Sequence, residues 1–303
     1  MNLVSRSITN YPEFRTLTKD LRDPYVTLVS QYLPYSDFNF TSIFSWSSGE
    51  AEVCMLKGNL LLKMPDYIDG STTYSLLGTN KVDEAVAIIL AEHGELDYVP
   101  DITKSSMRHP ELFNISKTRE HFDYIYNVES LAKLEGRDYK KLRNKIHTFE
   151  IYHADIPLST KHHTVLNSKL IDEIIKLDKE WSIKSSRDQG DTLNERKAIK
   201  YLLDNFNDLS LILTCVYAGD KLIAFSINEL LDDHYALCHF EKALTDHHVN
   251  TGPYIIREVA KYLLTKGATL LNWEQDLGLE GLRRSKMGYH PVTMLEKYKI
   301  SRL

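Results

Sequence analysis

Residues 211–227 have the sequence LILTCVYAGDKLIAFSI, in which two apolar runs flank a Gly-Asp pair. Glycine adopts the positive φ angles that a tight turn requires, so this stretch predicts a β-hairpin. Residues 52–64, EVCMLKGNLLLKM, have the same form around a Gly-Asn pair. The next strand-like runs, YSLLG from Tyr74 and YALCHF from Tyr235, each begin 16 residues after the hairpin glycine. The pattern therefore occurs twice with equal spacing.

Each of these strands is followed by a helical pattern and then by a short apolar run. The helices are predicted at Val82–Ala91 and Tyr254–Leu264, and the strands after them at Leu96–Val99 and Thr269–Trp273. The repeated order of hairpin, strand, helix and strand predicts an internal duplication of an α/β unit. Chance similarity of two ordinary α/β patterns is the alternative.

We expect the first unit to close with the alternating strand His121–Val128 and the second with Pro291–Ile300. The predicted organisation is an N-terminal unit over 1–135, a basic linking helix over 136–155 and a C-terminal unit over 156–303.

The charge is uneven along the chain. The sequence carries a net charge of −5, but residues 136–147 carry +4 and residues 281–303 carry +5, which leaves −14 on the rest. A mainly acidic chain is poorly suited to coating DNA, which needs a broad basic face. Two local basic segments suit one anionic ligand, such as a phosphate, the acceptor end of a tRNA or a lipid headgroup. Solvated helix faces are the plain alternative.

The first basic segment has the period of a helix. Tyr139, Leu142, Ile146 and Phe149 recur at spacings of three and four residues, which predicts one buried stripe with the lysines on other faces.

Composition limits the class of protein. The three cysteines lie in apolar stretches without CxxC spacing, which indicates buried thiols in a reducing compartment. The first residues lack the apolar core of a signal peptide, and no apolar run is long enough to cross a bilayer. We expect a cytoplasmic protein with at most peripheral membrane contact. No HxxxH or HExxH spacing occurs, so no metal site is expected.

The order of elements is typical of the GNAT acyltransferase fold, so we expect an α/β (α+β) protein with tandem GNAT-like units, in which mixed sheets are flanked by helices. In that fold, amides at a helix N-terminus bind the pyrophosphate of acyl-CoA. The equivalent loop here contains Asn250 and Gly252, which are the candidate residues if acyl-CoA is used, but Pro253 removes one donor.

Two segments resemble the C-terminal domain of phosphatidylglycerol lysyltransferases, a tandem-GNAT family. One runs from Asp123 through KLRNK (141–145) to Phe149, and the other is NWEQDLGLEGLRRSKMGYHP (272–291) followed by Lys297 and Tyr298. The resemblance implies transfer of an amino acid from aminoacyl-tRNA to a lipid hydroxyl. By this resemblance Lys141, Arg143 and Asn144 become candidate substrate-binding residues.

The end of the predicted strand 269–273 supplies candidate catalytic side chains. Alternation along a strand would place Asn272, Glu274 and Asp276 on one face and Gln275 on the other. Glu274 or Asp276 is a candidate general base or a ligand for an α-ammonium group, and Asn272 and Gln275 are candidate substrate ligands. In the structural alternative, Asp276 caps the following turn and Glu274 pairs with a nearby cation.

Four further residues complete the predicted site. In the GNAT fold two neighbouring parallel strands separate, and we expect Glu241 and Lys242, after the strand 234–240, to lie opposite residues 272–276 across that gap. Glu241 is then a candidate catalytic residue and Lys242 a candidate substrate ligand. A strand-end ion pair of the two is the alternative. Arg283 and Lys286, three residues apart on a short helix, are candidate phosphate ligands and resemble the family's GLR–K pattern.

Three functions follow. The leading hypothesis is an acyltransferase that moves an aminoacyl group from aminoacyl-tRNA to the hydroxyl or amine of a lipid headgroup or small molecule. The alternatives are acyl-CoA-dependent N- or O-acetyl transfer and a non-catalytic tandem-GNAT binding module.

Overall fold

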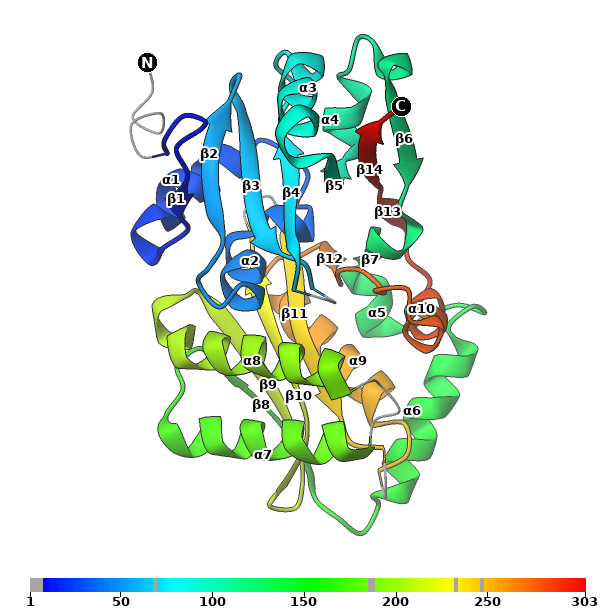
Figure 1. Ribbon diagram of the computed structural model, residues 1–303. Helices are drawn as coiled ribbons and strands as arrows, with labels where there is room; N and C mark the ends of the chain where they lie inside the picture. The colour runs from blue at the N-terminus through cyan, green and yellow to red at the C-terminus, as the bar shows by residue number, and fades with distance from the viewer. Residues whose placement is uncertain (1–7, 68–69, 185–188, 232–233, 246–247) are drawn as a thin grey trace. The chain divides into compact units, whose positions relative to one another are not determined.

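The computed structural model describes residues 8–67, 70–184, 189–231, 234–245 and 248–303 (Figure 1). The chain divides into two compact units, each assembled from separate segments. Unit 1 consists of Met1–Asp123, Gln275–Glu280 and Met294–Leu303, and unit 2 of Tyr124–Glu274 and Gly281–Thr293. The predicted division at residues 135 and 155 concerns the repeat in the sequence, and it stays a prediction.

Unit 1 contains two sheets, and one helix packs against residues of both. Hydrogen-bonded neighbours follow the order β1-β2-β3-β4 in one sheet and β5-β14-β6 in the other. Its strands are β1 (Arg15–Thr16), β2 (Glu52–Leu56), β3 (Asn59–Pro65), β4 (Thr72–Leu77), β5 (Glu95–Pro100), β6 (Phe113–Lys117) and β14 (Lys297–Arg302). Its helices are α1 (Arg22–Val29), α2 (Phe40–Trp46), α3 (Val82–His93) and α4 (Asp101–Ser105).

The core of unit 1 explains its periodicity. Val82, Val86 and Ile89 recur on one face of α3 and are fully buried against residues of both sheets. Helix α3 therefore joins the two sheets through one apolar stripe.

Unit 2 is built around one seven-stranded sheet with the order β13-β7-β12-β11-β10-β9-β8. Its strands are β7 (Asp123–Asn127), β8 (Leu158–His163), β9 (Leu211–Ala218), β10 (Lys221–Leu230), β11 (Tyr235–Ala243), β12 (Leu270–Asn272) and β13 (Thr293–Leu295). Its helices are α5 (Val128–Lys133), α6 (Lys140–Tyr152), α7 (Ser168–Lys184), α8 (Gln189–Asn205), α9 (Thr251–Thr265) and α10 (Glu280–Met287).

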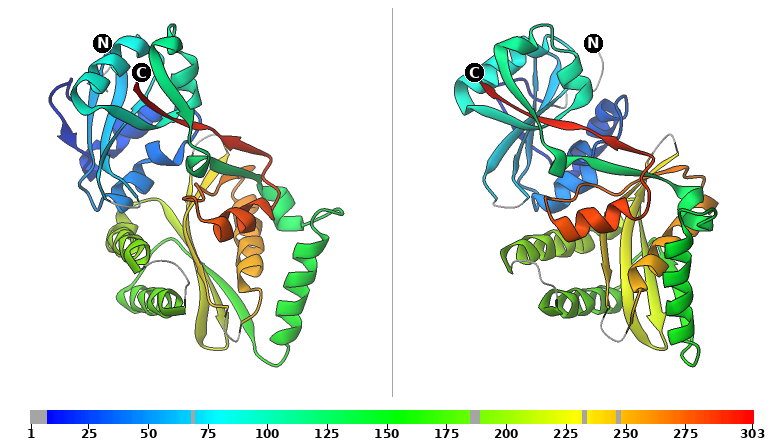
Figure 2. Two further views of the ribbon diagram at one scale, coloured as in Figure 1. Left: turned by 45° about the vertical axis from the view of Figure 1, so that its right-hand side comes forward. Right: turned by 90° about the vertical axis from the view of Figure 1, so that its right-hand side faces the viewer.

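Helices cover both faces of this sheet. In Figures 1 and 2, α7 and α8 lie on one face and α6 and α9 on the other. All eight residues of β9 are buried, as are eight of the ten residues of β10. A strand covered on both sides must be apolar throughout, which is why residues 211–227 form near-continuous apolar runs.

The predicted α/β class with mixed sheets and flanking helices is confirmed, and so are both hairpins. β2 pairs with β3 around a turn in which Lys57 and Gly58 both have positive φ, one residue earlier than expected. β9 pairs with β10 around Gly219, which has a φ of 60°.

The stripe predicted from Tyr139 onward is also confirmed for three of its members. On α6, Leu142, Ile146 and Phe149 are buried, whereas Tyr139 precedes the helix and is half-buried.

The prediction that 121–128 closes the first unit is wrong. The predicted strand 291–300 is divided in two: β13 lies at the edge of the seven-stranded sheet, whereas β14 lies in a sheet of unit 1. β7, which follows the first unit in sequence, pairs with β12 in the sheet of unit 2. β14, near the end of the chain, lies between β5 and β6 in unit 1. Alternating apolar residues define a strand but carry no information about its partner, so either strand fits either sheet.

Among the described residues, no helix combines the length and the apolar character that a bilayer crossing requires.

Candidate active site

Strand β11 runs beyond the end of its parallel neighbour in unit 2. β12 pairs with β11 only from Leu270 to Asn272, opposite Tyr235 to Leu237. β11 continues to Ala243, so its last part has no hydrogen-bonded strand on that side within the described ranges. The predicted separation of two parallel strands is therefore present in unit 2.

Glu241 lies on the part of β11 that pairs with β10 on one side and extends beyond β12 on the other. Its side chain is half-buried, and its carboxylate forms no hydrogen bond or ion pair with any described residue. Burial raises the pKa of Glu241 to about 8, although the charges of Lys286 and Lys242 act to lower it. A carboxyl group with a pKa near neutrality is suited to accept a proton from an attacking nucleophile.

A buried histidine lies between two other carboxylates near this strand. In His239, Nε2 lies 3.4 Å from Oε2 of Glu229 on β10, and Nδ1 lies 3.6 Å from Oε1 of Glu274. The pairing of β10 with β11 shifts register here, so His239 is the extra residue of a β-bulge. Bulges of this kind redirect a side chain out of the regular alternation.

The charge state of His239 follows from these neighbours. Burial lowers its pKa, but the neighbouring carboxylates of Glu229 and Glu274 outweigh burial and raise the pKa to about 9. At neutral pH the imidazole is therefore protonated.

The predicted strand alternation ends at Asn272. Glu274 has a φ of +49°, in the left-handed region, and its N–H donates to Oδ1 of Asn272 at 2.7 Å. This tight turn directs the Glu274 side chain toward His239 and leaves it 15% exposed. A non-glycine residue in this conformation costs about 1 kcal/mol or more, a cost that is often found at functional sites.

Lys286 on α10 holds this turn in place. Its side chain is buried, its ammonium donates to the carbonyl of Trp273, and it lies 5.6 Å from the centroid of the Tyr124 ring. The phenol of Tyr126 donates to the Lys286 carbonyl at 2.9 Å. Lys286 therefore contacts the loop of the site, while Arg283, on the same helix, is half-buried.

Gln275 and Asp276 belong to unit 1 and are both buried. Oδ2 of Asp276 lies 3.2 Å from Nη1 of Arg119, and its Oδ1 accepts the N–H of Gly278 at 3.0 Å. This bonding matches the structural alternative in which Asp276 caps the following turn.

Lys242 makes its contacts with the helices that cover the sheet. Its ammonium lies 2.7 Å from Oε2 of Glu195 on α8 and 3.6 Å from the ring centroid of Trp181 on α7. Because the Lys242 ammonium group is buried and paired with Glu195, these contacts fix its position. The structure thus gives Glu241 and the adjacent Lys242 different surroundings.

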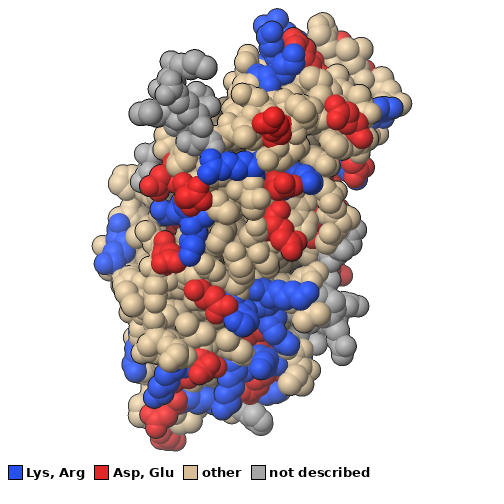
Figure 3. Space-filling view, turned by 60° about the vertical axis from the view of Figure 1, so that its left-hand side comes forward, with Lys and Arg blue, Asp and Glu red and all other residues tan. Residues whose placement is uncertain are grey.

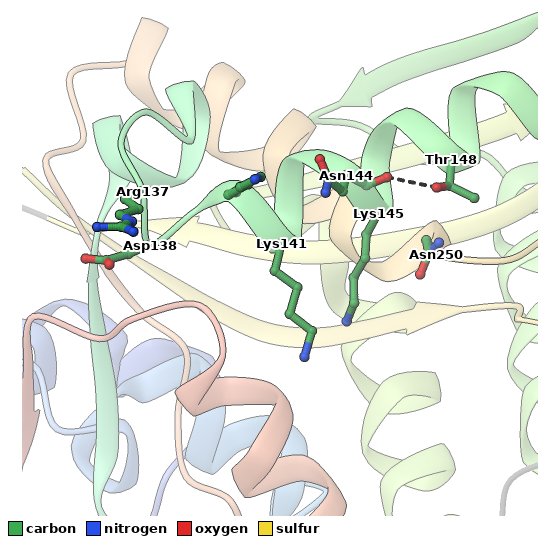
Figure 4. A pocket seen from close by; sticks show the side chains of 8 residues that line it. Arg137, Asp138, Lys141, Asn144, Lys145, Thr148 and Asn250 are labelled. Atoms are coloured by element: carbon green, nitrogen blue, oxygen red, sulfur yellow. Dashed lines mark hydrogen bonds between the residues drawn. The ribbon is translucent and has the colours of Figure 1, made fainter.

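The predicted residues of the basic segment separate into two groups. Lys141 and Asn144, together with Asn250 before α9, line one pocket of about 480 Å³ (Figure 4). Arg143 instead donates to the carbonyls of Leu134 and Gly136, and so it fixes the loop that precedes α6.

The start of α9 offers few donors for a pyrophosphate. The N–H of Thr251 donates to the carbonyl of His248, and Pro253 has no N–H. Gly252 is then the amide that remains among the first three helical positions, and the space beside its Cα is open. This arrangement gives weak support to an acyl-CoA site.

Our sequence interpretation missed His239 and Glu229. Both residues occur inside strongly apolar strands, YALCHF and KLIAFSINEL. A titratable residue in a fully covered strand must have a buried partner, and that signal was available in the sequence.

The comparisons with known proteins agree with this architecture. A family described as "Phosphatidylglycerol lysyltransferase, C-terminal" matches residues 80–301. No curated protein matches the chain.

Several solved structures are similar. A conserved protein of unknown function from Bacteroides thetaiotaomicron is 25% identical, with a TM-score of 0.82 over 96% of this chain and 99% of that one. L-PGS from Bacillus licheniformis is 13% identical, with a TM-score of 0.59 over 86% of each chain.

FemX is 10% identical, with a TM-score of 0.58 over 96% of this chain and 97% of that one. The chain thus has a GNAT-like acyltransferase fold. Since the family match covers more than half of its length, the chain belongs to the phosphatidylglycerol lysyltransferase C-terminal family.

Proposed function

We propose that this acyltransferase moves an aminoacyl group from aminoacyl-tRNA to a hydroxyl or amine of a lipid headgroup or small molecule. The observation that carries the proposal is Glu241. It lies where β11 extends beyond β12, forms no hydrogen bond or ion pair through its carboxylate among the described residues, and has a pKa raised to about 8.

In the proposed reaction Glu241 is the general base. It removes the proton of the acceptor hydroxyl or amine as that atom attacks the carbonyl carbon of the aminoacyl ester. The new ester or amide bond forms, the bond to the ribose oxygen breaks, and the proton passes to that leaving oxygen. A positioned base of this kind contributes about 10²- to 10⁴-fold to a transfer rate.

Glu274 is proposed to bind the α-ammonium group of the aminoacyl donor. Among Glu229, His239 and Glu274, the side chain of Glu274 is the most exposed, at 15%. A carboxylate in this place can accept charge-assisted hydrogen bonds from an ammonium group. Asn272, whose Oδ1 accepts the Glu274 N–H, fixes the turn that presents the carboxylate.

The donor is assigned to tRNA rather than CoA for a local reason. The start of α9, with Pro253 at its third position, presents too few amides to cradle a pyrophosphate. Family membership supports the same assignment.

The test is an incubation of the purified protein with radiolabelled aminoacyl-tRNAs and, separately, with acetyl-CoA, in the presence of phosphatidylglycerol vesicles or small amines. We expect label to move from tRNA to an acceptor, at a rate that rises with pH and levels off above about pH 8.

Glu241→Gln should lower the transfer rate at least 100-fold. Glu135→Gln, at an exposed position of the same unit, is the matched control and should leave the rate unchanged. Consumption of acetyl-CoA would favour the CoA-dependent alternative, and failure to use either donor would favour a binding module.

A further inference from the structure

The pocket on α6 gathers cations that have no anionic partner in the protein. Arg137, Lys140, Lys141 and Lys145 line it, all are exposed, and none forms an ion pair with a described residue. Asp138 at its edge is the one carboxylate among the lining residues.

Many other surface cations have partners. Figure 3 shows a face on which basic and acidic side chains adjoin one another. On α8, for example, Lys200 lies 2.6 Å from Asp204. In a chain with a net charge of −5, an unpaired cationic pocket is a local exception that attracts an external anion.

The pocket is extended along the helix. Figure 4 shows Lys141 and Lys145 side by side on one side of α6. Residues four apart on a helix have Cβ atoms about 5–6 Å apart, so these ammonium groups form a row. A row of cations suits several linked phosphates better than one isolated phosphate, around which the donors would converge.

The remaining lining residues indicate which kind of polyanion fits. Asn144, Thr148 and Asn250 are neutral donors and acceptors, and no lining residue is apolar. A helix that docks on an anionic membrane inserts apolar side chains beside its cations. The apolar side chains that α6 does expose, Ile151 and Tyr152, lie at its end, outside this lining. The polar lining itself suits the phosphates and 2′-hydroxyls of RNA.

We propose that this pocket binds the sugar–phosphate backbone of an RNA strand, without reading its bases. The inference rests on the proposed function, because it assigns a surface to the RNA part of the donor. Since lysine and arginine contacts to phosphate carry no sequence information, α6 holds the donor but does not choose among tRNAs.

The test measures binding of an uncharged RNA hairpin with a single-stranded CCA end, by fluorescence anisotropy at several salt concentrations. Four phosphate contacts to a single strand predict a slope of about −3 for log K against log salt, or about a 50-fold loss between 50 and 200 mM. Lys141→Gln/Lys145→Gln should halve the slope and reduce that loss to about sevenfold.

The matched control is Lys133→Gln/Lys200→Gln. It removes the same charge from exposed lysines of unit 2 that are paired with Glu129 and Asp204. We expect it to bind RNA like the unaltered protein. Hairpins with different sequences should bind with equal affinity.

Three results would overturn the inference. The first is that both double variants bind RNA equally well, and the second is that the protein binds phosphatidylglycerol vesicles but not RNA. The third is a strong preference for one RNA sequence that depends on Lys141 and Lys145. Because uncharged RNA is used, the outcome is independent of catalysis. RNA binding without transfer would refute the proposed function and leave the pocket assignment standing.

Discussion

Replacement of Glu241 by glutamine should stabilise unit 2 although it lowers the transfer rate at least 100-fold. A half-buried carboxyl group without a partner lowers the stability of the fold when it is ionised, whereas a carboxylate with a structural partner raises the stability. Because Glu241 has no hydrogen bond or ion pair among the described residues, its removal breaks no such contact. Glutamine keeps the shape of the side chain and removes only the charge.

The sign and size follow from the pKa. The folded-state pKa of about 8 lies above the ordinary value of 4.5. The unfolded chain therefore loses its proton first as the pH rises, and the folded state loses stability through the window from 4.5 to 8. Each pK unit corresponds to about 1.4 kcal/mol, which gives an upper limit of about 5 kcal/mol, and solvent near the half-buried carboxylate reduces this to about 2–3 kcal/mol.

The assay is urea unfolding at pH 5, 7 and 8.5, followed by tryptophan fluorescence. Trp181 and Trp273 lie in unit 2 and Trp46 in unit 1, so a Trp46→Phe background reports on unit 2. The difference between Glu241→Gln and its parent should be small at pH 5 and largest at pH 8.5. His239, which also titrates in this range, is present in both proteins and cancels in the difference.

A variant less stable than its parent at pH 8.5 would refute this reasoning, because it would show that the Glu241 carboxylate has a stabilising partner. A stability difference that does not change with pH would show that its pKa is not raised. Either result would also remove the physical basis for Glu241 as the base.

Two further substitutions test roles assigned to buried and helical cations. Lys297→Met should destabilise unit 1 by about 3–5 kcal/mol, because it leaves the carboxylates of Asp37 and Asp123 buried without their cation. Hydrogen exchange of the β5 amides measures this loss of stability, and unchanged protection of those amides would contradict the prediction. Arg143→Ala should lower the melting temperature, because it removes charged hydrogen bonds to two loop carbonyls, which are worth about 1.5–3 kcal/mol. The same variant should change the RNA affinity less than twofold, and a larger loss of affinity would place Arg143 in the RNA site.

Local patterns predicted the elements of this protein well. The hairpins around Gly58 and Gly219 depend on a turn that only a few residue types adopt, and α6 depends on a stripe at helical spacing. Such features are determined by neighbours in sequence, so composition and period suffice to locate them.

The arrangement of the site depends on contacts that sequence spacing does not contain. The positive φ of Glu274 ends the regular strand alternation from which a shared face for Glu274 and Asp276 was predicted. The β-bulge at His239 directs a ring toward two carboxylates from other parts of the chain. Both are departures from regular strands, and regular periods are what pattern analysis assumes.

The place of β14 in unit 1 shows why the repeat alone could not give the architecture. β14 is hydrogen-bonded on both sides in unit 1, and its Lys297 places a buried ammonium 2.7 Å from Oδ1 of Asp123 and beside Asp37. Without residues 294–303, β5 and β6 would lack the strand between them and two buried carboxylates would lack their cation. Unit 1 therefore cannot be completed by the first 123 residues, because its central pairing joins segments almost 200 residues apart. The two consecutive units predicted from the sequence therefore do not coincide with the two compact units, each of which is assembled from separate segments of the chain.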